Sequence, residues 1–169
     1  TTKEKVVLGQ TYVAPQSDQV MVTFTKLPEH SGTLSIEEVT LSSKQVRELN
    51  AFSETAYDVT SSMEDGTFAY VLTLPIPKDK KDVQVKYAED TAGTLHAETV
   101  ARKNIEQKQD TVEVTLDHFT LFVATYGDAL MTIDKSEFVP GETIHLKATG
   151  LNEMQYYRLA LDPPVGNRI

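Results

Sequence analysis

Residues 118–120, His-Phe-Thr, are neighbours whose types could carry out a reaction. The hydroxyl of Thr120 could attack the carbonyl of the preceding peptide bond, with His118 as the general base that takes the hydroxyl proton. The Phe119–Thr120 amide would become an ester by an N-to-O shift, and water would then hydrolyse that ester. Such a site also needs an oxyanion partner, which the sequence does not identify. The pattern therefore makes self-cleavage between Phe119 and Thr120 one hypothesis.

The same triplet also has a structural interpretation. His118 and Thr120 would lie on one face of a β-strand while Phe119 points into the core, because side chains alternate along a strand. Asp117 is the turn-forming residue nearest to the triplet, and no glycine follows until Gly127. We favour the structural interpretation and keep self-cleavage as the alternative.

Other polar residues form no recognisable site in the sequence. His30, His96 and His145 are far apart, without HxH or HxxxH spacing, so we expect no histidine metal site. The stretch MEDG at residues 63–66 lacks the spacing of a calcium loop and is typical of a hairpin turn. No glycine-rich phosphate loop or nucleophile elbow occurs. We therefore expect no metal and no cofactor.

The elements around the triplet follow the period-two pattern of β-strands. Hydrophobic and polar residues alternate in QVMVTFTKL, GTFAYVLTLP, DVQVKY and TVEVTL, and turn-forming residues separate these runs. Short alternating strands punctuated in this way are typical of an antiparallel β-sandwich. The predicted fold class is therefore all-β, an antiparallel sandwich.

One segment breaks the alternation. In LSSKQVRELNAF, Ser42 is followed three residues later by Gln45, which is the arrangement of a capping box. Leu41 and Val46 have the spacing of a hydrophobic staple across that cap. We predict a short helix over residues 43–51 that crosses one end of the sandwich. An irregular loop is the alternative, because helices this short depend on tertiary contacts.

A boundary is expected near residues 126–129, in the stretch TYGDA. It divides the chain into a β-sandwich module at residues 1–126 and a second unit at residues 128–169. The phrase FVPGETIHLKATGL is similar to the opening of immunoglobulin-like surface modules, and MQYYRLAL adds one further strand. Three strands bury too little apolar area to close a sandwich alone. We therefore expect a partial module, which either rests on the first domain or takes strands from sequence beyond this chain.

The triplet also carries a family resemblance. His118-Phe119-Thr120 and the aliphatic strand after it resemble the cleavage sequence of GAIN domains, and the tripeptide resembles the His-Phe-Ser of related self-cleaving domains. The paired cysteines and tryptophans of the GAIN pattern are absent. A second resemblance covers most of the first domain. AYDVTSSMEDGTFAYVLTLPIP, VQVKYAED and LDHFTLFV resemble β modules repeated in large secreted or surface proteins of uncultured bacteria, and this resemblance implies no assigned activity.

Composition limits the partners. The 169 residues carry a net charge of −9, and both nucleic acid and anionic membranes reward a basic surface instead. We expect no nucleic acid partner and no membrane insertion, since no apolar run approaches the roughly 18 residues that a bilayer crossing requires. The chain contains no cysteine, which excludes disulfides and thiolate metal sites.

Together these patterns favour a structural or adhesive β-sandwich module of a secreted or cell-surface multidomain protein from a bacterium. Its expected partners are neighbouring domains of a longer chain, and other surface proteins or glycans. The first alternative is a GAIN-like autoproteolytic domain that cleaves between Phe119 and Thr120. The second is a carbohydrate-binding module, which a cluster of exposed Tyr12, Tyr57, Tyr156 or Tyr157 would favour.

Overall fold

The computed structural model describes residues 5–92, 96–128, 130–133, 139, 141 and 143–151. Its strands are β1 (Thr11–Ala14), β2 (Ser17–Lys26), β3 (Leu34–Thr40), β4 (Thr55–Ser61), β5 (Ala69–Pro75), β6 (Gln84–Ala88), β7 (Glu98–Thr99), β8 (Ile105–Gln107), β9 (Thr111–Leu116), β10 (Leu121–Thr125), β11 (Leu130–Ile133) and β12 (Leu146–Thr149). Helix α1 (Ser43–Leu49) follows β3, and the short 3₁₀ helix η2 (Arg102–Asn104) precedes β8.

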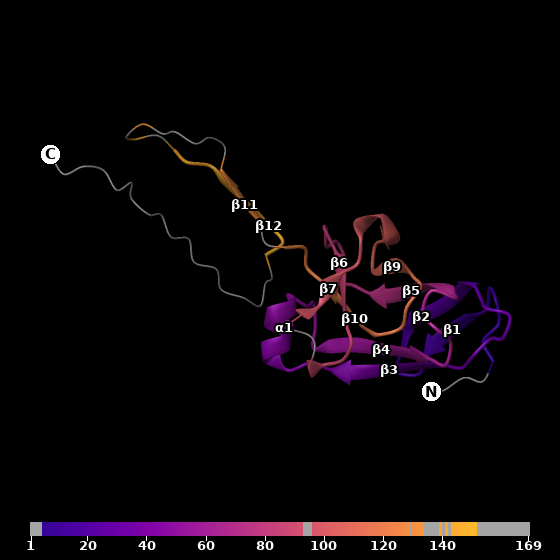
Figure 1. Cartoon of the computed structure of the whole chain (residues 1–169). Helices are drawn as coiled ribbons and strands as arrows, with labels where there is room; N and C mark the ends of the chain where they lie inside the picture. The colour runs from indigo at the N-terminus through magenta and orange to yellow at the C-terminus, as the bar shows by residue number, and fades with distance from the viewer. Residues whose placement is uncertain are drawn as a thin grey trace.

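The strands form two five-stranded sheets that face each other as a sandwich (Figure 1). One sheet has the order β1-β2-β5-β9-β8, and the other has the order β3-β4-β10-β6-β7. Every strand pair that the structure describes is antiparallel. The expected all-β class and antiparallel sandwich are therefore confirmed.

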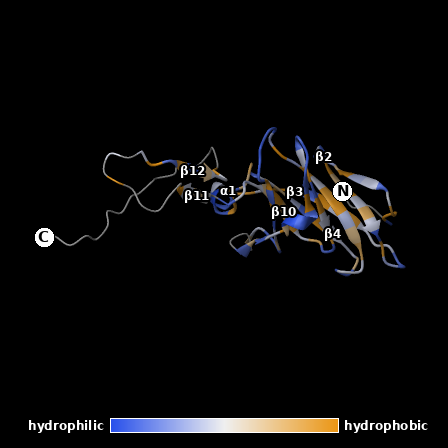
Figure 2. Cartoon of the chain, turned by 90° about the horizontal axis from the view of Figure 1, so that it is seen from above, coloured by the Kyte–Doolittle hydropathy of each residue, from blue (hydrophilic) through white to orange (hydrophobic). Residues whose placement is uncertain are grey.

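The core between the sheets is built from the alternating positions of the strands. The largest contributions come from β2, β5 and β9, whose inward side chains are Val20, Val22, Phe24, Tyr70, Leu72, Leu74, Val112, Val114 and Leu116. Figure 2 shows that hydrophobic residues are concentrated on the strands of the sandwich. Since each fully buried aliphatic or aromatic side chain contributes about 1.5–3 kcal/mol relative to exposure, this alternation supplies the main driving force for the fold.

Strand β10 is buried on both of its faces, which explains its lack of alternation. Phe122 points into the core between the sheets, whereas Leu121 and Val123 belong to a second hydrophobic cluster on the outer face of their sheet. Helix α1 covers this cluster with Val46 and Leu49. A strand that is covered on two sides reads as a continuous apolar run, as LFVAT does.

Helix α1 confirms the prediction of a short helix. Ser42 is the N-cap, and its side chain and that of Gln45 complete the capping box in both directions. Leu41 and Val46 are buried in the same cluster, as the staple requires. The helix ends at Leu49, and Asn50 follows in the left-handed conformation.

Residues after 127 contain the hairpin β11–β12, which extends from the end of the sandwich where α1 lies (Figure 1). The predicted strand MQYYRLAL lies outside the described residues. The immunoglobulin-like character of residues 128–169 therefore stays a prediction. Among the described residues, no helix has the length and hydropathy that a membrane crossing requires.

A pair of like charges on the first two strands of one sheet gives a testable pH dependence. Glu37 of the edge strand β3 lies opposite Asp58 of β4. Burial, together with the charge of Glu37, raises the pKa of the Asp58 carboxyl above its ordinary value of 3.8. Between the unfolded and folded pKa values the folded protein binds more protons, so stability falls as pH rises through this window.

We expect Asp58→Asn to raise the melting temperature at neutral pH, because it removes a charge that the folded protein disfavours. The gain should disappear below the ordinary pKa of the carboxyl, where Asp58 is neutral in both states. Thermal unfolding followed by circular dichroism across this pH range measures the effect. The same change at the exposed Asp18 controls for the altered net charge. A gain that persists unchanged in acid would contradict this explanation.

Candidate functional site

The His-Phe-Thr triplet lies where the chain passes from one sheet to the other. Strand β9 ends at Leu116 and pairs with β5, whereas β10 begins at Leu121 and pairs with β4 and β6. Residues 117–120 therefore form an inter-sheet link. The sequence correctly indicated a strand on each side of the triplet. The expectation that His118 and Thr120 share one face of a strand is wrong, because the chain changes sheets at these residues.

A second inter-sheet link holds the first one in place. Residues 62–68 connect β4 and β5, which belong to different sheets, so the expected hairpin turn at MEDG is instead a crossing. Gly66 N donates to Asp117 O at 2.7 Å, and Phe119 N donates to Asp65 Oδ1 at 3.2 Å. Each link thus supplies the acceptor for a backbone N–H group of the other link. These N–H groups lie where the chain has left the strand ladders, so they need partners of this kind.

The ring of Phe119 closes this end of the core. It stacks on Phe68 with ring centroids 4.1 Å apart and on Tyr70 at 5.1 Å. Phe24 meets the same ring edge-on at 6.3 Å. Aromatic contacts at these separations add about 0.5–1.5 kcal/mol to area burial. The position of Phe119 in the core, expected from the structural interpretation, is therefore confirmed.

Tyr70 fixes the backbone of the triplet from inside the core. Its hydroxyl donates to the carbonyl oxygen of His118 at 2.8 Å. Burial, with smaller contributions from the carboxylates of Asp65 and Asp117, raises the pKa of Tyr70 well above its ordinary value, so the hydroxyl stays a donor. The sequence alone does not connect Tyr70 with the triplet. The pairing of β5 with β9, which sets Tyr70 opposite Leu116, is the signal that could have found it.

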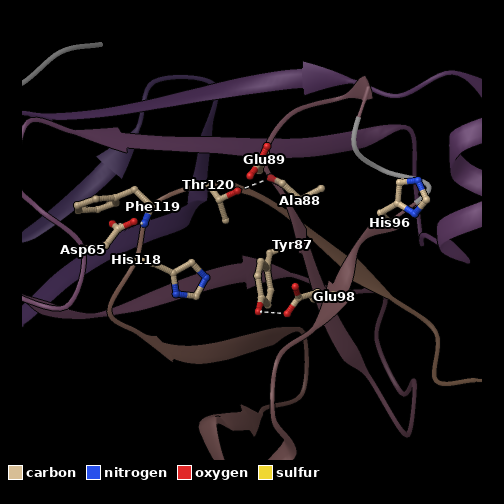
Figure 3. A pocket seen from close by; sticks show the side chains of 9 residues that line it. All are labelled: Asp65, Tyr87, Ala88, Glu89, His96, Glu98, His118, Phe119 and Thr120. Atoms are coloured by element: carbon tan, nitrogen blue, oxygen red, sulfur yellow. Dashed lines mark hydrogen bonds between the residues drawn. The ribbon is translucent and has the colours of Figure 1, made fainter.

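A hollow of about 440 Å³ opens beside the link (Figure 3). It is lined by Asp65, Tyr87, Ala88, Glu89, His96, Glu98, His118, Phe119 and Thr120. The imidazole of His118 lies against Tyr87, with ring centroids 4.8 Å apart, and its Nδ1 is 3.2 Å from Asp117 Oδ1. The hydroxyl of Tyr87 donates to Glu98 at 2.7 Å, and this bond raises the pKa of Tyr87.

The groups of the triplet are turned away from each other. Thr120 Oγ1 donates to the carbonyl oxygen of Ala88, at the end of the adjacent strand β6, as Figure 3 shows. His118 Nε2 is buried and has no hydrogen-bond partner among the described residues, so neither ring nitrogen is hydrogen-bonded to Thr120. A base must reach the proton that it removes. In this arrangement the hydroxyl strengthens the pairing of the link with β6, and His118 fills space beside Tyr87.

The remaining candidates lie apart. His96 lines the hollow, whereas His30 and His145 are exposed elsewhere. The part of the chain that the structure describes contains no group of three or more His, Asp or Glu side chains placed to hold a metal ion. Tyr12 and Tyr57 are buried, so they do not form the exposed cluster that carbohydrate binding would use. Tyr156 and Tyr157 lie outside the described residues.

The fold and the site define an antiparallel β-sandwich whose two sheets are joined by docked crossings. Comparison of the chain with protein-family models, with curated proteins and with solved structures gave no match. The resemblances to GAIN-type domains and to bacterial surface modules therefore stay hypotheses.

The geometry leads us to expect an intact chain. Purified protein held at neutral pH should give a single mass of 18.8 kDa, because the Thr120 hydroxyl donates to Ala88 O and is not hydrogen-bonded to His118. Denaturing gels and intact mass spectrometry over time measure this. Fragments ending at Phe119 and beginning at Thr120 would show self-cleavage. Thr120→Ala should then abolish the break, Thr120→Ser should retain it, and His118→Ala should slow it strongly.

The structural role of the triplet predicts unequal costs for its members. We expect Phe119→Ala to lower the free energy of unfolding by about 3 kcal/mol, since it empties an aromatic site that is partly buried. Thr120→Ala should cost about 1 kcal/mol through loss of one hydrogen bond. Urea unfolding measures both, with Phe52→Ala at the opposite end as a matched aromatic control. Equal costs for the Phe119 and Thr120 variants would be inconsistent with this role.

Proposed function

We propose that this chain is a structural module of a secreted or cell-surface bacterial protein, in which the sandwich acts as a spacer between neighbouring segments. One observation carries the proposal, namely that the chain enters and leaves the sandwich at opposite ends of β3. Val6 N donates to Gly32 O at 3.1 Å, just before β3 begins. Gly127 O accepts from Asn50 Nδ2 at 3.2 Å, beyond the end of β3 where α1 lies.

The distance between these two ends is set by the strands. Strand β3 contains 7 residues, and a strand rises about 3.3 Å per residue, which gives about 23 Å. Val6 is buried, and β10, which leads to Gly127, pairs with both β4 and β6. Both connections are thus anchored in the core. Such a module would extend a longer chain by a fixed step.

The two alternative functions receive less support from the described residues. Self-cleavage needs a hydroxyl that is free to attack, and the Thr120 hydroxyl donates to Ala88 O. Carbohydrate binding would use exposed aromatic side chains, and Tyr12 and Tyr57 are buried. The proposed secreted or surface location rests on the resemblance to bacterial β modules. An adhesive role would follow from that location, because glycans and other proteins would be within reach of the module.

Pulling the chain by its two ends tests the spacer function. Because β10 is hydrogen-bonded along both edges, force applied at Gly127 acts on these bonds together rather than one at a time. We expect one discrete unfolding step for residues 6–127, with a length gain of about 3.6 Å per residue less the folded length. Optical tweezers or force microscopy measures this step.

A matched pair of variants sharpens the pulling experiment. Phe122→Ala removes a fully buried side chain of β10 and should lower the unfolding force. Met131→Ala shortens a side chain of the hairpin that is 50% exposed and should leave the step unaltered. Gradual extension at low force, without a discrete step, would sink the proposal.

A further inference from the structure

Asn50, the residue that follows α1, contacts both legs of the hairpin β11–β12. Its Nδ2 donates to Gly127 O and to Gly150 O, each at 3.2 Å. Gly127 precedes β11 and Gly150 follows β12. A single side-chain amide therefore bonds both legs at the base of the hairpin, and we call this pair of hydrogen bonds the Asn50 clamp.

We propose that Asn50 is the positioning residue that fixes the orientation of the following β-hairpin, and that the α1 end of the sandwich recognises this hairpin through its backbone carbonyl groups. This inference deepens the proposed spacer function. Its functional significance rests on that proposal, whereas the contacts themselves do not. The segment bound at this end of the sandwich is the hairpin β11–β12. It follows β10 through Gly127 and returns to Asn50 at Gly150.

The conformation of Asn50 argues for this role over simple helix capping. Asn50 has φ 58° and ψ 40°, a left-handed conformation for which glycine is the preferred residue. Its Oδ1 is buried without a hydrogen-bond partner among the described residues, which carries a desolvation cost. Glycine would end the helix without that cost. The amide donors of Asn50 are the feature that glycine lacks, and they are directed at the hairpin.

Lys86 strengthens the same end of the sandwich. Its side chain is only 15% exposed, and Nζ donates to Leu49 O at 3.2 Å, at the carbonyl end of α1. Nζ also lies 3.9 Å from Asp128 Oδ1, on the first leg of the hairpin. A cation at a helix C-terminus is favourable. Lys86 therefore links the helix end, which carries Asn50, to the start of the hairpin.

The two glycines allow the backbone to approach closely at the base of the hairpin. A Cβ at Gly127 would lie 2.7 Å from Asp82 O. Gly150 has φ +69°, and a Cβ there would collide with Asp128 O and lie 2.6 Å from Gly127 O. A side chain at either position would therefore displace the leg that carries it. The base of the hairpin therefore requires glycine at positions 127 and 150.

Three side chains of the hairpin that the structure describes are largely exposed, so they add little packing against the sandwich. Met131 is 50% exposed, Ile133 is 47% exposed and Leu146 is 39% exposed. Figure 1 shows the hairpin extending away from the sandwich beyond its base. The side-chain contacts of Asn50 and Lys86 therefore act where the hairpin meets the sandwich, in addition to the backbone hydrogen bond from Tyr126 N to Asn50 O.

Distances between spin labels test the proposal directly. The chain contains no cysteine, so pairs of introduced cysteines label uniquely. Thr115→Cys with Thr132→Cys spans the sandwich and the hairpin, and Thr60→Cys with Thr115→Cys lies within the sandwich; all three positions are exposed. Double electron–electron resonance on the full chain should give one narrow distance peak for each pair.

We expect Asn50→Gly to abolish the narrow sandwich–hairpin peak, because it keeps the left-handed cap and removes both donors. Asn50→Asp should do the same, since a carboxylate oxygen would face two carbonyl oxygens. The sandwich pair should keep its peak in both variants. Asn104→Gly, a matched change in η2, should alter neither distribution.

A narrow sandwich–hairpin peak that persists in Asn50→Gly would overturn the proposal, as would a broad distribution in the parent chain. If Asn50→Gly also broadens the distance distribution of the sandwich pair, the Gly150→Ala variant tests the clamp instead. This change lies in the hairpin and displaces Gly150 O, one of the two acceptors of Asn50. Retention of the narrow peak in that variant would equally overturn the clamp. The unfolding step of the pulling experiment is independent of these distances, so failure of the clamp and failure of the spacer are distinguishable.

Discussion

The hydrogen bonds between the two inter-sheet links, Gly66 N to Asp117 O and Phe119 N to Asp65 Oδ1, join the sheets at one end of the sandwich. Each link supplies the acceptor for a backbone N–H group of the other link. Phe119, which belongs to one of these links, packs against the aromatic rings of Phe24, Phe68 and Tyr70 in the core. The relative position of the two sheets at this end depends on the pairing, because β5, β9 and β10 all start or finish beside it.

The opposite end is closed by different means. Helix α1 covers Leu121 and Val123 of β10, so this strand is buried on both faces. Strand β10 therefore connects the two closures, with the triplet at its start and Tyr126 and Gly127 after its end. Tyr126 N donates to Asn50 O at 2.9 Å, and its ring lies 4.3 Å from that of Phe52. Force or orientation transmitted between the chain ends would pass along this strand, which is consistent with a spacer.

Local features of this structure were predictable from the sequence, and long-range ones were not. The alternation of β2, β5 and β9 and the Ser42–Gln45 capping box depend on neighbours within a few residues, and both predictions were correct. The crossing at residues 117–120 was missed because its partner, Asp65, is more than fifty positions away in sequence. The Asp-Gly pair at residues 65–66 indicates a turn, but not whether the strands on either side share a sheet. Asn50 was read as part of a helix, since nothing local marks its contacts with Gly127 and Gly150.

The hydroxyl of Thr120 shows why the same residue types can serve either chemistry or architecture. In the structure it donates to Ala88 O, where β6 ends beside the link. Attack on the Phe119 carbonyl would require it to leave this acceptor, which costs about 1 kcal/mol for the lost hydrogen bond. His118 would also have to leave the ring of Tyr87 and the carboxylate of Asp117. A site adapted to cleavage gains its rate from groups already placed for the transition state. Here the Thr120 hydroxyl and the His118 ring are instead held by contacts that stabilise the inter-sheet link. The same contacts keep the hydroxyl from attacking the Phe119 carbonyl.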